Sequence, residues 1–302
     1  MIHASMSQIK LLSPYLTEGY TWLKGNLHTH TTFSDGTHTA EEVIANYEQC
    51  GYDFLGISDH DVFTAPHDYQ HMTQMVLIPV VEVTSLGPHI QQIGVHQRVE
   101  PDTDRQAVVD RINSDGGFAV MNHPNWEWHF NHFPQEMMSD LQGAIGLEVY
   151  NGVIERLDGS ALASDRWDRL LSVGRQLWGF ANDDAHYPTD VGVAWNVVQS
   201  PARSADDIMS ALRQGQFYAS TGVMVKSVEI DGLCIRIETE NAQRIRFLTR
   251  FGTIRSSTDG ASAEWELPDN LTQLKNWRYV RIECYGEGGR MAWLQPIRID
   301  VH

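Results

Sequence analysis

One stretch of the chain places two histidines, an acidic residue and a glycine behind a short apolar run: Leu27-His28-Thr29-His30-Thr31-Thr32-Phe33-Ser34-Asp35-Gly36. Alternate side chains of a β-strand share a face, so His28 and His30 can present two imidazoles to one ion at a strand end. The turn through Ser34 and Gly36 can return Asp35 toward this pair, because glycine tolerates a sharply bent backbone. Taken alone, two histidines in one strand are more often ordinary surface residues than metal ligands.

Histidines and acidic residues recur at the ends of later apolar segments, and this recurrence favours metal ligands over ordinary surface residues. The segments are short and bounded by turn residues, which is typical of buried strands. The expected strands and the residues beside them are 22–27 before His28, 54–57 before Asp59 and His60, 76–81 before Glu82, 90–95 after His89, 118–121 before Asn122 and His123, 145–149 before Tyr150, and 177–181 before Asp184 and His186.

Helices are expected between these strands. Thr39 and Glu42 form a capping-box pattern that begins a helix running to Cys50. Further helices are expected from Asp102 or Thr103 to Ser114, over residues 160–173, and from Ser204 to Arg213. This alternation indicates an α/β fold with a parallel sheet, and the number of repeats favours a closed or nearly closed barrel. Functional side chains of such barrels gather at the C-terminal ends of the strands.

The pattern changes after about residue 222, where apolar and polar residues alternate with a period of two. Antiparallel strands with one solvated face are expected over residues 225–231, 233–238, 244–248 and 279–285. The sequence therefore predicts two domains, a barrel over residues 18–222 and a small C-terminal β-sandwich-like module over residues 223–302.

Composition limits the possible functions of the chain. The 302 residues contain 42% hydrophobic and 20% charged residues, which is typical of a globular soluble protein. No apolar run approaches the roughly 18 residues of a membrane span, and residues 1–10 lack the pattern of a signal peptide, so a cytoplasmic location is expected. The net charge of −17 argues against a surface that follows nucleic-acid phosphates.

The three cysteines are scattered and show no paired spacing. We expect Cys50, Cys234 and Cys284 to be small buried apolar residues, and neither a disulfide framework nor a thiolate metal site.

Nine residues are candidate metal ligands, and all are imidazoles or carboxylates: His28, His30, Asp35, His60, Glu82, His89, His123, Asp184 and His186. This chemistry suits Zn, Mn or Fe and discriminates poorly among them. Nine groups exceed the four to six ligands of one ion, so two or three divalent ions that share carboxylates are expected.

Several neighbours of these residues have simpler interpretations. Asp59, Asp61 and Asp183 are expected to cap turns or to orient ligating rings. His129 and His132 are interpreted as part of an aromatic flap over the pocket mouth. His89 precedes its strand, and an ordinary loop histidine is nearly as good an interpretation at that position.

These motifs together resemble the PHP family, the polymerase and histidinol phosphatase superfamily, over about residues 20–222. The residues that carry the resemblance are His28-x-His30, Ser34-Asp35-Gly36, Asp59-His60, Glu82, Asn122-His123-Pro124 and Asp184-x-His186. The resemblance implies a distorted seven-stranded β/α barrel with a di- or trinuclear metal centre that hydrolyses phosphoesters. Further stretches, including Glu148-Val-Tyr-Asn-Gly152, look like the carbaryl-hydrolase-like branch, some of whose members are similar to carboxylic or carbamic ester hydrolases. Asp35 stands where other relatives carry His, a difference that bears on the third metal site.

The expected activity is metal-dependent hydrolysis of a small-molecule phosphoester by a metal-bridged hydroxide. His89 or His186 is a candidate proton donor to the leaving group, an ability that metal ligation would remove from either. Arg156, Arg166 and Lys24 are possible phosphate clamps, but each is more readily explained as a solvated charge. Four alternatives remain open: a carboxylic or carbamic ester hydrolase on the same centre, amidohydrolase-type chemistry, a metal-binding scaffold without catalysis, and nuclease action, which the net charge disfavours. No membrane partner is expected, and the sequence leaves the oligomeric state open.

Overall fold

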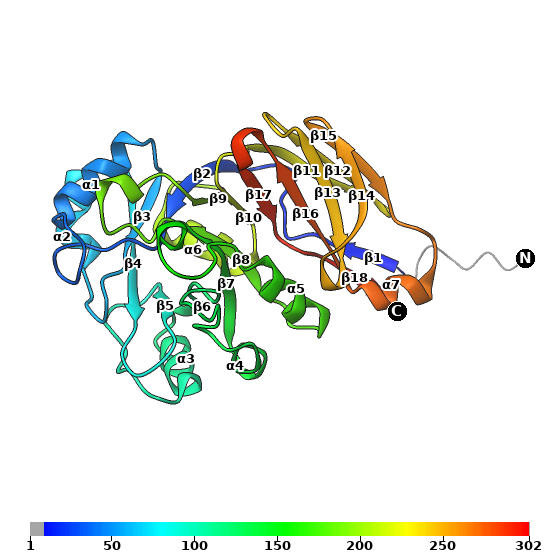
Figure 1. Ribbon diagram of the computed structural model, residues 1–302. Helices are drawn as coiled ribbons and strands as arrows, with labels where there is room; N and C mark the ends of the chain where they lie inside the picture. The colour runs from blue at the N-terminus through cyan, green and yellow to red at the C-terminus, as the bar shows by residue number, and fades with distance from the viewer. Residues whose placement is uncertain (1–8, 302) are drawn as a thin grey trace, which may run out of the picture.

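The computed structural model describes residues 9–301, and a mixed sheet of fifteen strands runs through it (Figure 1). In spatial order the sheet contains β1 (Ile9–Leu12), β18 (Ile297–Val301), β16 (Tyr279–Tyr285), β17 (Met291–Leu294), β10 (Phe217–Ser220), β9 (Trp195–Ser200), β2 (Thr21–Asn26), β3 (Phe54–Ile57), β4 (Val76–Val83), β5 (Ile90–Ile93), β6 (Phe118–Met121), β7 (Ala144–Asn151) and β8 (Trp178–Asn182). Strands β13 (Arg244–Thr249) and β14 (Thr253–Asp259) join it through β16.

The helices lie between the strands of the N-terminal part, as the α/β pattern predicts (Figure 1). They are α1 (Ala40–Gln49), α2 (Pro66–Tyr69), α3 (Arg105–Ser114), α4 (Gln135–Asp140), α5 (Ser164–Ser172) and α6 (Ala205–Gln214), with α7 (Leu271–Trp277) near the C-terminus. None of the helices within residues 9–301 has the length and apolar composition needed to cross a bilayer.

Parallel pairing joins β2 to β3, β3 to β4, β6 to β7 and β7 to β8, whereas β5 runs antiparallel between β4 and β6. No ladder joins β8 to another strand than β7 within residues 9–301. Two other contacts connect β8 to the strands on the far side of the sheet. The side chain of Asn196 in β9 bonds to the backbone of Ala181 in β8, and an isolated bridge joins Thr29 after β2 to Ala185 after β8. The mixed α/β fold is therefore confirmed, and the closed seven-stranded barrel stays a prediction.

Side-chain hydrogen bonds at the N-cap determine where helices α1 and α3 begin. Thr39 forms the predicted capping box with Glu42. The cap of α3 is Asp104, so the prediction of Asp102 or Thr103 was wrong. Asp102 accepts a hydrogen bond from the backbone N–H of Asp104, which holds it in the preceding turn.

Helix α5 begins at Ser164, four residues after the predicted start. The side chain of Ser160 forms hydrogen bonds with both the N–H and the C=O of Leu162, and the backbone N–H of Asn151 bonds to the carbonyl of Ala161. These bonds hold residues 160–162 in an extended turn, which delays the helix.

The C-terminal strands form two sheets around a common core. Strands β11 (Val225–Asp231), β12 (Cys234–Thr239) and β15 (Ser262–Glu266) make a separate three-stranded sheet. Ile235 and Ile237 from this sheet share one apolar cluster with Phe247 and Ile282 from the large sheet. This arrangement is consistent with a C-terminal β module. The boundary at residue 222 stays a prediction, and the ladder between β10 and β17 connects the two parts.

The expectation of one solvated face holds for β11 but is wrong for β16. Residues 279–284 of β16 are buried on both faces. Helix α5 covers the second face, where Arg281 pairs with Asp168 at 2.5 Å and the hydroxyl of Tyr279 donates to Asp168 at 2.7 Å. A buried ion pair replaces solvent on that face.

All three cysteines are free thiols, as predicted. Cys284 lies in the core of the β module, but Cys50 is exposed and Cys234 is half-buried, so the expectation of burial was wrong for these two. Cys50 follows α1 at its C-cap, beyond the face that Val43, Ile44 and Tyr47 turn toward the core.

Replacing Arg281 by alanine is expected to lower the free energy of unfolding by about 3–5 kcal/mol, because the buried carboxylate of Asp168 loses its partner. Urea denaturation followed by circular dichroism measures the loss. Arg244→Ala is the matched control, since Arg244 pairs with Asp259 on the exposed surface, and we expect a loss of at most about 1 kcal/mol. Equal losses in both variants would contradict this account of the pair.

Candidate metal centre

The nine predicted ligands lie together at one end of the strands of the N-terminal part. His28 and His30 follow β2, His60 follows β3, Glu82 lies within β4, and His89 directly precedes β5. His123 follows β6, Asp184 and His186 follow β8, and Asp35 returns to the group from the turn after β2. Polar atoms of His28, His123 and Asp184 all lie within 4.8 Å of one another.

Glu82 lies at the middle of this group. Its Oε1 is 3.3 Å from Nε2 of His28, 3.1 Å from Nδ1 of His89 and 3.1 Å from Nε2 of His123. Its Oε2 is 2.8 Å from Nδ1 of His60 and 3.6 Å from Nε2 of His30. Each oxygen of one buried carboxylate therefore faces a different set of imidazoles, which would allow the carboxylate to contact more than one ion.

Two aspartates contact different histidines of the group. Oδ1 of Asp184 lies 3.2 Å from Nε2 of His28 and 3.0 Å from Nε2 of His30. Asp35 lies 3.4 Å from Nε2 of His60 and 3.3 Å from Nε2 of His186. Ligand atoms from His30, Asp35, His60 and His186 form one set within 4.8 Å, as the returning turn predicts.

Three buried polar atoms here lack a well-aligned hydrogen bond among the described residues, although the last two are 2.8 Å apart: Nε2 of His28, Nδ1 of His60 and Oε2 of Glu82. An unpaired polar atom in a protein interior costs roughly 1–3 kcal/mol. All three atoms are good donors to a divalent cation, and bound cations would satisfy them. The residues present therefore fit a centre of hard or borderline divalent metals.

The carboxylates of the group remain ionised. Burial alone raises the pKa of Glu82 and Asp184, but the adjacent imidazoles, His28 first, outweigh burial and hold both pKa values below the usual range. Burial lowers the pKa of His60, yet the adjacent carboxylates of Asp35 and Glu82 raise it to about 10. Divalent cations can replace the imidazole protons that balance these acids, because metal binding displaces protons from its ligands.

Backbone strain accompanies two of the candidate ligands. His123 has φ of +27° and Asp184 has φ of +54°, in the left-handed region that non-glycine residues rarely adopt. Such conformations persist where surrounding bonds hold them and are concentrated at functional sites. The N–H of His123 donates to Glu148, and the N–H of Asp184 donates to the carbonyl of His28.

Glu148 is a buried acid at this site that the sequence analysis did not include among the ligands. It accepts hydrogen bonds from Nδ1 of His28 at 2.8 Å, from the backbone of His123 at 2.9 Å, and from the side chains of Asn151 and Asn182. This network directs Nε2 of His28 toward Glu82 and Asp184. The only sign of this role in the sequence is that Glu148 is the single acidic residue in the apolar run 145–149.

Asn122 makes a similar contribution on the other side of the group. Its side-chain nitrogen donates to Oε1 of Glu82 at 2.7 Å and to Gln91 at 2.6 Å. The bond fixes the orientation of the Glu82 carboxylate. Nothing in the sequence beyond its position before His123 indicated this contact.

The three aspartates interpreted as turn caps or orienting residues make such contacts. Asp59 accepts from the N–H and hydroxyl of Thr31 and from Ser34, which holds the turn that carries Asp35. Asp183 accepts from three successive backbone N–H groups at residues 192–194. Asp61 accepts from Thr84 and Ser85 after β4.

Gly36 is needed in that turn for a different reason than the one predicted. A Cβ atom at position 36 would lie 2.5 Å from the backbone of His30. The φ of Gly36 lies outside the left-handed region, so its dihedral angles do not require glycine. Glycine is needed because two backbone segments approach each other closely at this position.

The aromatic segment after His123 lies against the group. The ring of Trp126 is 5.6 Å from His89 and 5.1 Å from His123. His132 joins His89 and His123 in a third cluster of ligand-type atoms. Its Nε2 accepts from the backbone N–H of His89 and its Nδ1 bonds to Glu127, so both ring nitrogens are already committed. His129 is 39% exposed and pairs with Glu127.

A cavity of about 280 Å³ opens onto the group. Six candidate ligands line it: Asp35, His60, His89, His123, Asp184 and His186. The other lining residues are Trp126, Val153, Ile154, Arg156, Leu157 and Tyr187.

Of the three predicted phosphate clamps, only Arg156 lines this cavity. Asp190 holds its guanidinium through two hydrogen bonds of 3.1 and 2.9 Å. Arg166 is buried in bonds to Asn125 and to the carbonyl of Phe130. Lys24 lies over the rings of Tyr52 and Trp195. Arg166 and Lys24 do not line this cavity, because both cations have partners elsewhere, and the buried Arg166 is not a solvated charge either.

Comparisons with known proteins match part of the chain to a family and most of it to a fold. A family model described as PHP-associated matches residues 174–217. A two-domain protein from Bacteroides vulgatus, which contains a predicted PHP-like metal-dependent phosphoesterase, matches with a TM-score of 0.55 and 18% identity, over 97% of this chain and 90% of that one. A search of curated proteins finds no match.

Two further solved structures match with TM-scores under 0.5. PsfC from Pseudomonas syringae PB-5123 matches at 0.47 and 13% identity, over 63% of this chain and 89% of that one. The lesion-specific endonuclease PfuEndoQ from Pyrococcus furiosus matches at 0.46 and 14% identity, over 65% of this chain and 56% of that one.

The PHP-associated model supports the resemblance to the PHP superfamily, and the Bacteroides structure shares the fold. The carbaryl-hydrolase-like branch stays a prediction. So does the expectation against nucleic acid, which depends on net charge alone.

Replacing Glu148 by glutamine is expected to weaken the affinity for divalent metal by about 10- to 100-fold, because His28 loses the charged acceptor that orients its ring. Competition with a chelating dye, using Mn or Zn, measures the affinity. The exposed Glu136 provides the matched control as Glu136→Gln. Unchanged affinity in the Glu148 variant would show that this network does not orient the ligand.

Proposed function

We propose that this protein is a metal-dependent hydrolase that cleaves phosphoesters of a small-molecule substrate. The observation that carries the proposal is the convergence of nine imidazole and carboxylate side chains on one cavity, with the two oxygens of Glu82 facing different sets of imidazoles. The fold shared with a protein that contains a predicted PHP-like metal-dependent phosphoesterase gives further support.

In this proposal two or three divalent ions are held by eight of the nine candidates, namely His28, His30, Asp35, His60, Glu82, His123, Asp184 and His186, and His89 is left free for proton transfer. Mn, Zn and Fe all suit this ligand set. When bound, the ions activate water and neutralise charge on the phosphoryl group. A centre of three divalent ions would stay positive beside three ligand carboxylates, Glu148 and a bound hydroxide, so it would attract an anionic substrate despite the acidic surface.

The chain's own residues bind and orient the substrate. Arg156 supplies a fixed cation at the cavity wall, and Asp190 keeps it in place. A guanidinium held in this way binds phosphate oxygens with little loss of side-chain entropy. Trp126, Val153 and Leu157 offer an apolar wall for the leaving group.

Of the two catalytic candidates, we assign proton donation to His89. Nδ1 of His186 lies 2.8 Å from the carbonyl of Asp184, and its Nε2 faces Asp35, so both nitrogens of His186 are committed. His89 lines the cavity with a side chain that is 16% exposed. Its Nδ1 faces Glu82, and its Nε2 has no hydrogen-bond partner within residues 9–301, which leaves that nitrogen available for a leaving oxygen.

The test of this function is an assay of phenyl phosphate, diphenyl phosphate, phenyl acetate and a phenyl carbamate with the metal-loaded protein. We expect turnover of at least one phosphate ester that chelation abolishes and added Mn or Zn restores. Turnover of the acetate or carbamate alone would favour the carboxylic or carbamic ester hydrolase instead. Stoichiometric metal without turnover of any substrate would favour the non-catalytic scaffold.

Replacing Arg156 by methionine is expected to raise KM for phenyl phosphate by roughly 10- to 100-fold, as loss of a charge-assisted hydrogen bond predicts. The KM for phenyl acetate should not change, because that substrate carries no negative charge. Arg169→Met, on the exposed face of α5, is the control. Equal losses on both substrates would show that Arg156 supports the cavity wall and does not bind phosphate.

A further inference from the structure

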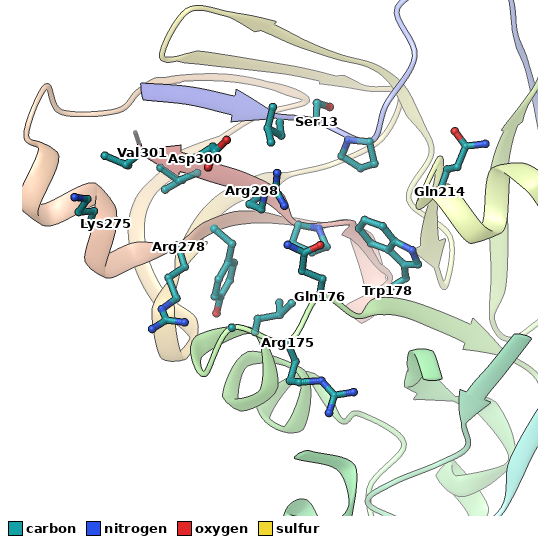
Figure 2. A pocket seen from close by; sticks show the side chains of 17 residues that line it. Ser13, Arg175, Gln176, Trp178, Gln214, Lys275, Arg278, Arg298, Asp300 and Val301 are labelled. Atoms are coloured by element: carbon teal, nitrogen blue, oxygen red, sulfur yellow. The ribbon is translucent and has the colours of Figure 1, made fainter. Parts of the chain in front are cut away.

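A second cavity, of about 460 Å³, lies between the C-terminal strands and the segment that joins α5 to β8 (Figure 2). Four parts of the chain line it: the strands β1 and β18, the segment around Gln176, the end of α6 at Gln214, and the end of α7. Its lining includes none of the candidate metal ligands. Cavities of this size between two structural units are common sites for small ligands.

The floor of this cavity is formed by three neighbouring strands. Arg298 in β18 lies opposite Leu12 in β1 and opposite Tyr279 in β16. Residues directly opposite in adjacent strands share a face of the sheet, so the three side chains line the cavity together. The hydroxyl of Tyr279 is bonded to Asp168, which fixes the position of its ring.

The end of α7 contributes Arg278 in an unusual backbone conformation. Its φ of +67° and ψ of −36° are unfavourable for a residue with a side chain. Its guanidinium lies against Gly174, where a Cβ atom would be 2.5 Å from Nη1. Strain of this kind is concentrated at functional positions, and the glycine makes room for the cation.

The cavity is cationic in a protein with 39 acidic and 22 basic residues. Lys275, Arg278 and Arg298 line it, and none of these side chains forms an ion pair or hydrogen bond within residues 9–301. Asp300 is the acid among the lining residues. Arg175 contributes only its stem, because its guanidinium is directed away to the carbonyls of Ser139 and Leu141 (Figure 2).

An aromatic surface lies beside these cations. Figure 2 shows Arg298, Gln176 and Trp178 around the middle of the cavity, with Arg278 and Lys275 along one side. The indole of Trp178 donates to the carbonyl of Arg213 at 3.0 Å and packs on Gly215, where a Cβ atom would be 2.8 Å from the ring. The ring is therefore held in place before any ligand binds.

We propose that this cavity binds a small organic anion, with a carboxylate or phosphate at Arg298 and Arg278 and a flat apolar body against Trp178 and Tyr279. Guanidinium groups recognise both anions through paired hydrogen bonds. The ligand would contact the C-terminal strands and the α5–β8 segment at once, and it would stabilise the junction between them by mass action. This site is separate from the metal centre and does not depend on the proposed hydrolase activity.

Calorimetric titration of the full-length, metal-loaded protein tests the proposal, with benzoate, phenylphosphonate and benzamide as probes. Benzamide has the shape of benzoate without its charge. We expect at least one anion to bind at least tenfold more tightly than benzamide. Arg298→Gln and Arg278→Gly are each expected to weaken that binding at least tenfold. Glycine tolerates the backbone conformation of residue 278, so the second variant removes the cation without adding strain.

Arg290→Gln, an exposed arginine of the β module outside the cavity, is the matched control and should bind the anions as the unmodified protein does. Failure of both anions to bind more tightly than benzamide would overturn the proposal. Binding that survives both cavity variants would overturn it as well. Loss of binding in Asp184→Asn with retention in the cavity variants would locate the anion at the metal centre, which also contradicts the proposal.

Discussion

The carboxylate of Glu82 is the contact on which the candidate site depends. It is fully buried within β4, and its two oxygens face imidazoles delivered by four other parts of the chain. A buried acid without compensation is costly, so its position is stable only if cationic partners converge on it. Asn122 holds one oxygen from the side. Without metal, protons on His28 and His60 supply compensating charge, because the nearby acids outweigh burial and raise the pKa of both rings. Divalent ions would supply it when bound.

The fold meets this requirement through the order of its strands. Strands β2, β3 and β4 are neighbours in parallel, so their C-terminal ends place His28, His60 and Glu82 side by side. The antiparallel β5 brings His89 to the same edge from its N-terminal end. Strained turns after β6 and β8 add His123 and Asp184. The C-terminal sheets lie beside this assembly through β10 and β17 and create a separate cationic cavity.

The sequence predicted those parts of the structure that depend on local pattern. The capping box at Thr39 and the polar residues at strand ends are local signals, and the structure brings all nine predicted ligands together. Residues whose roles depend on distant partners were missed. In the sequence, Glu148 is only one residue of an expected strand. Its role depends on His28 and Asn182, which only the fold brings next to it. The burial of β16 on both faces depends on α5, more than a hundred residues earlier in the chain, and the exposure of Cys50 depends on which face of α1 meets the core.

Anomalous diffraction from crystals of the protein grown with Mn or Zn tests the central claim most directly. The account predicts at least two anomalous peaks on either side of the Glu82 carboxylate, each at about 2.0–2.2 Å from its nearest imidazole nitrogen or carboxylate oxygen. A crystal with no anomalous peak within coordinating distance of Glu82, at metal concentrations that saturate the protein in solution, would contradict it.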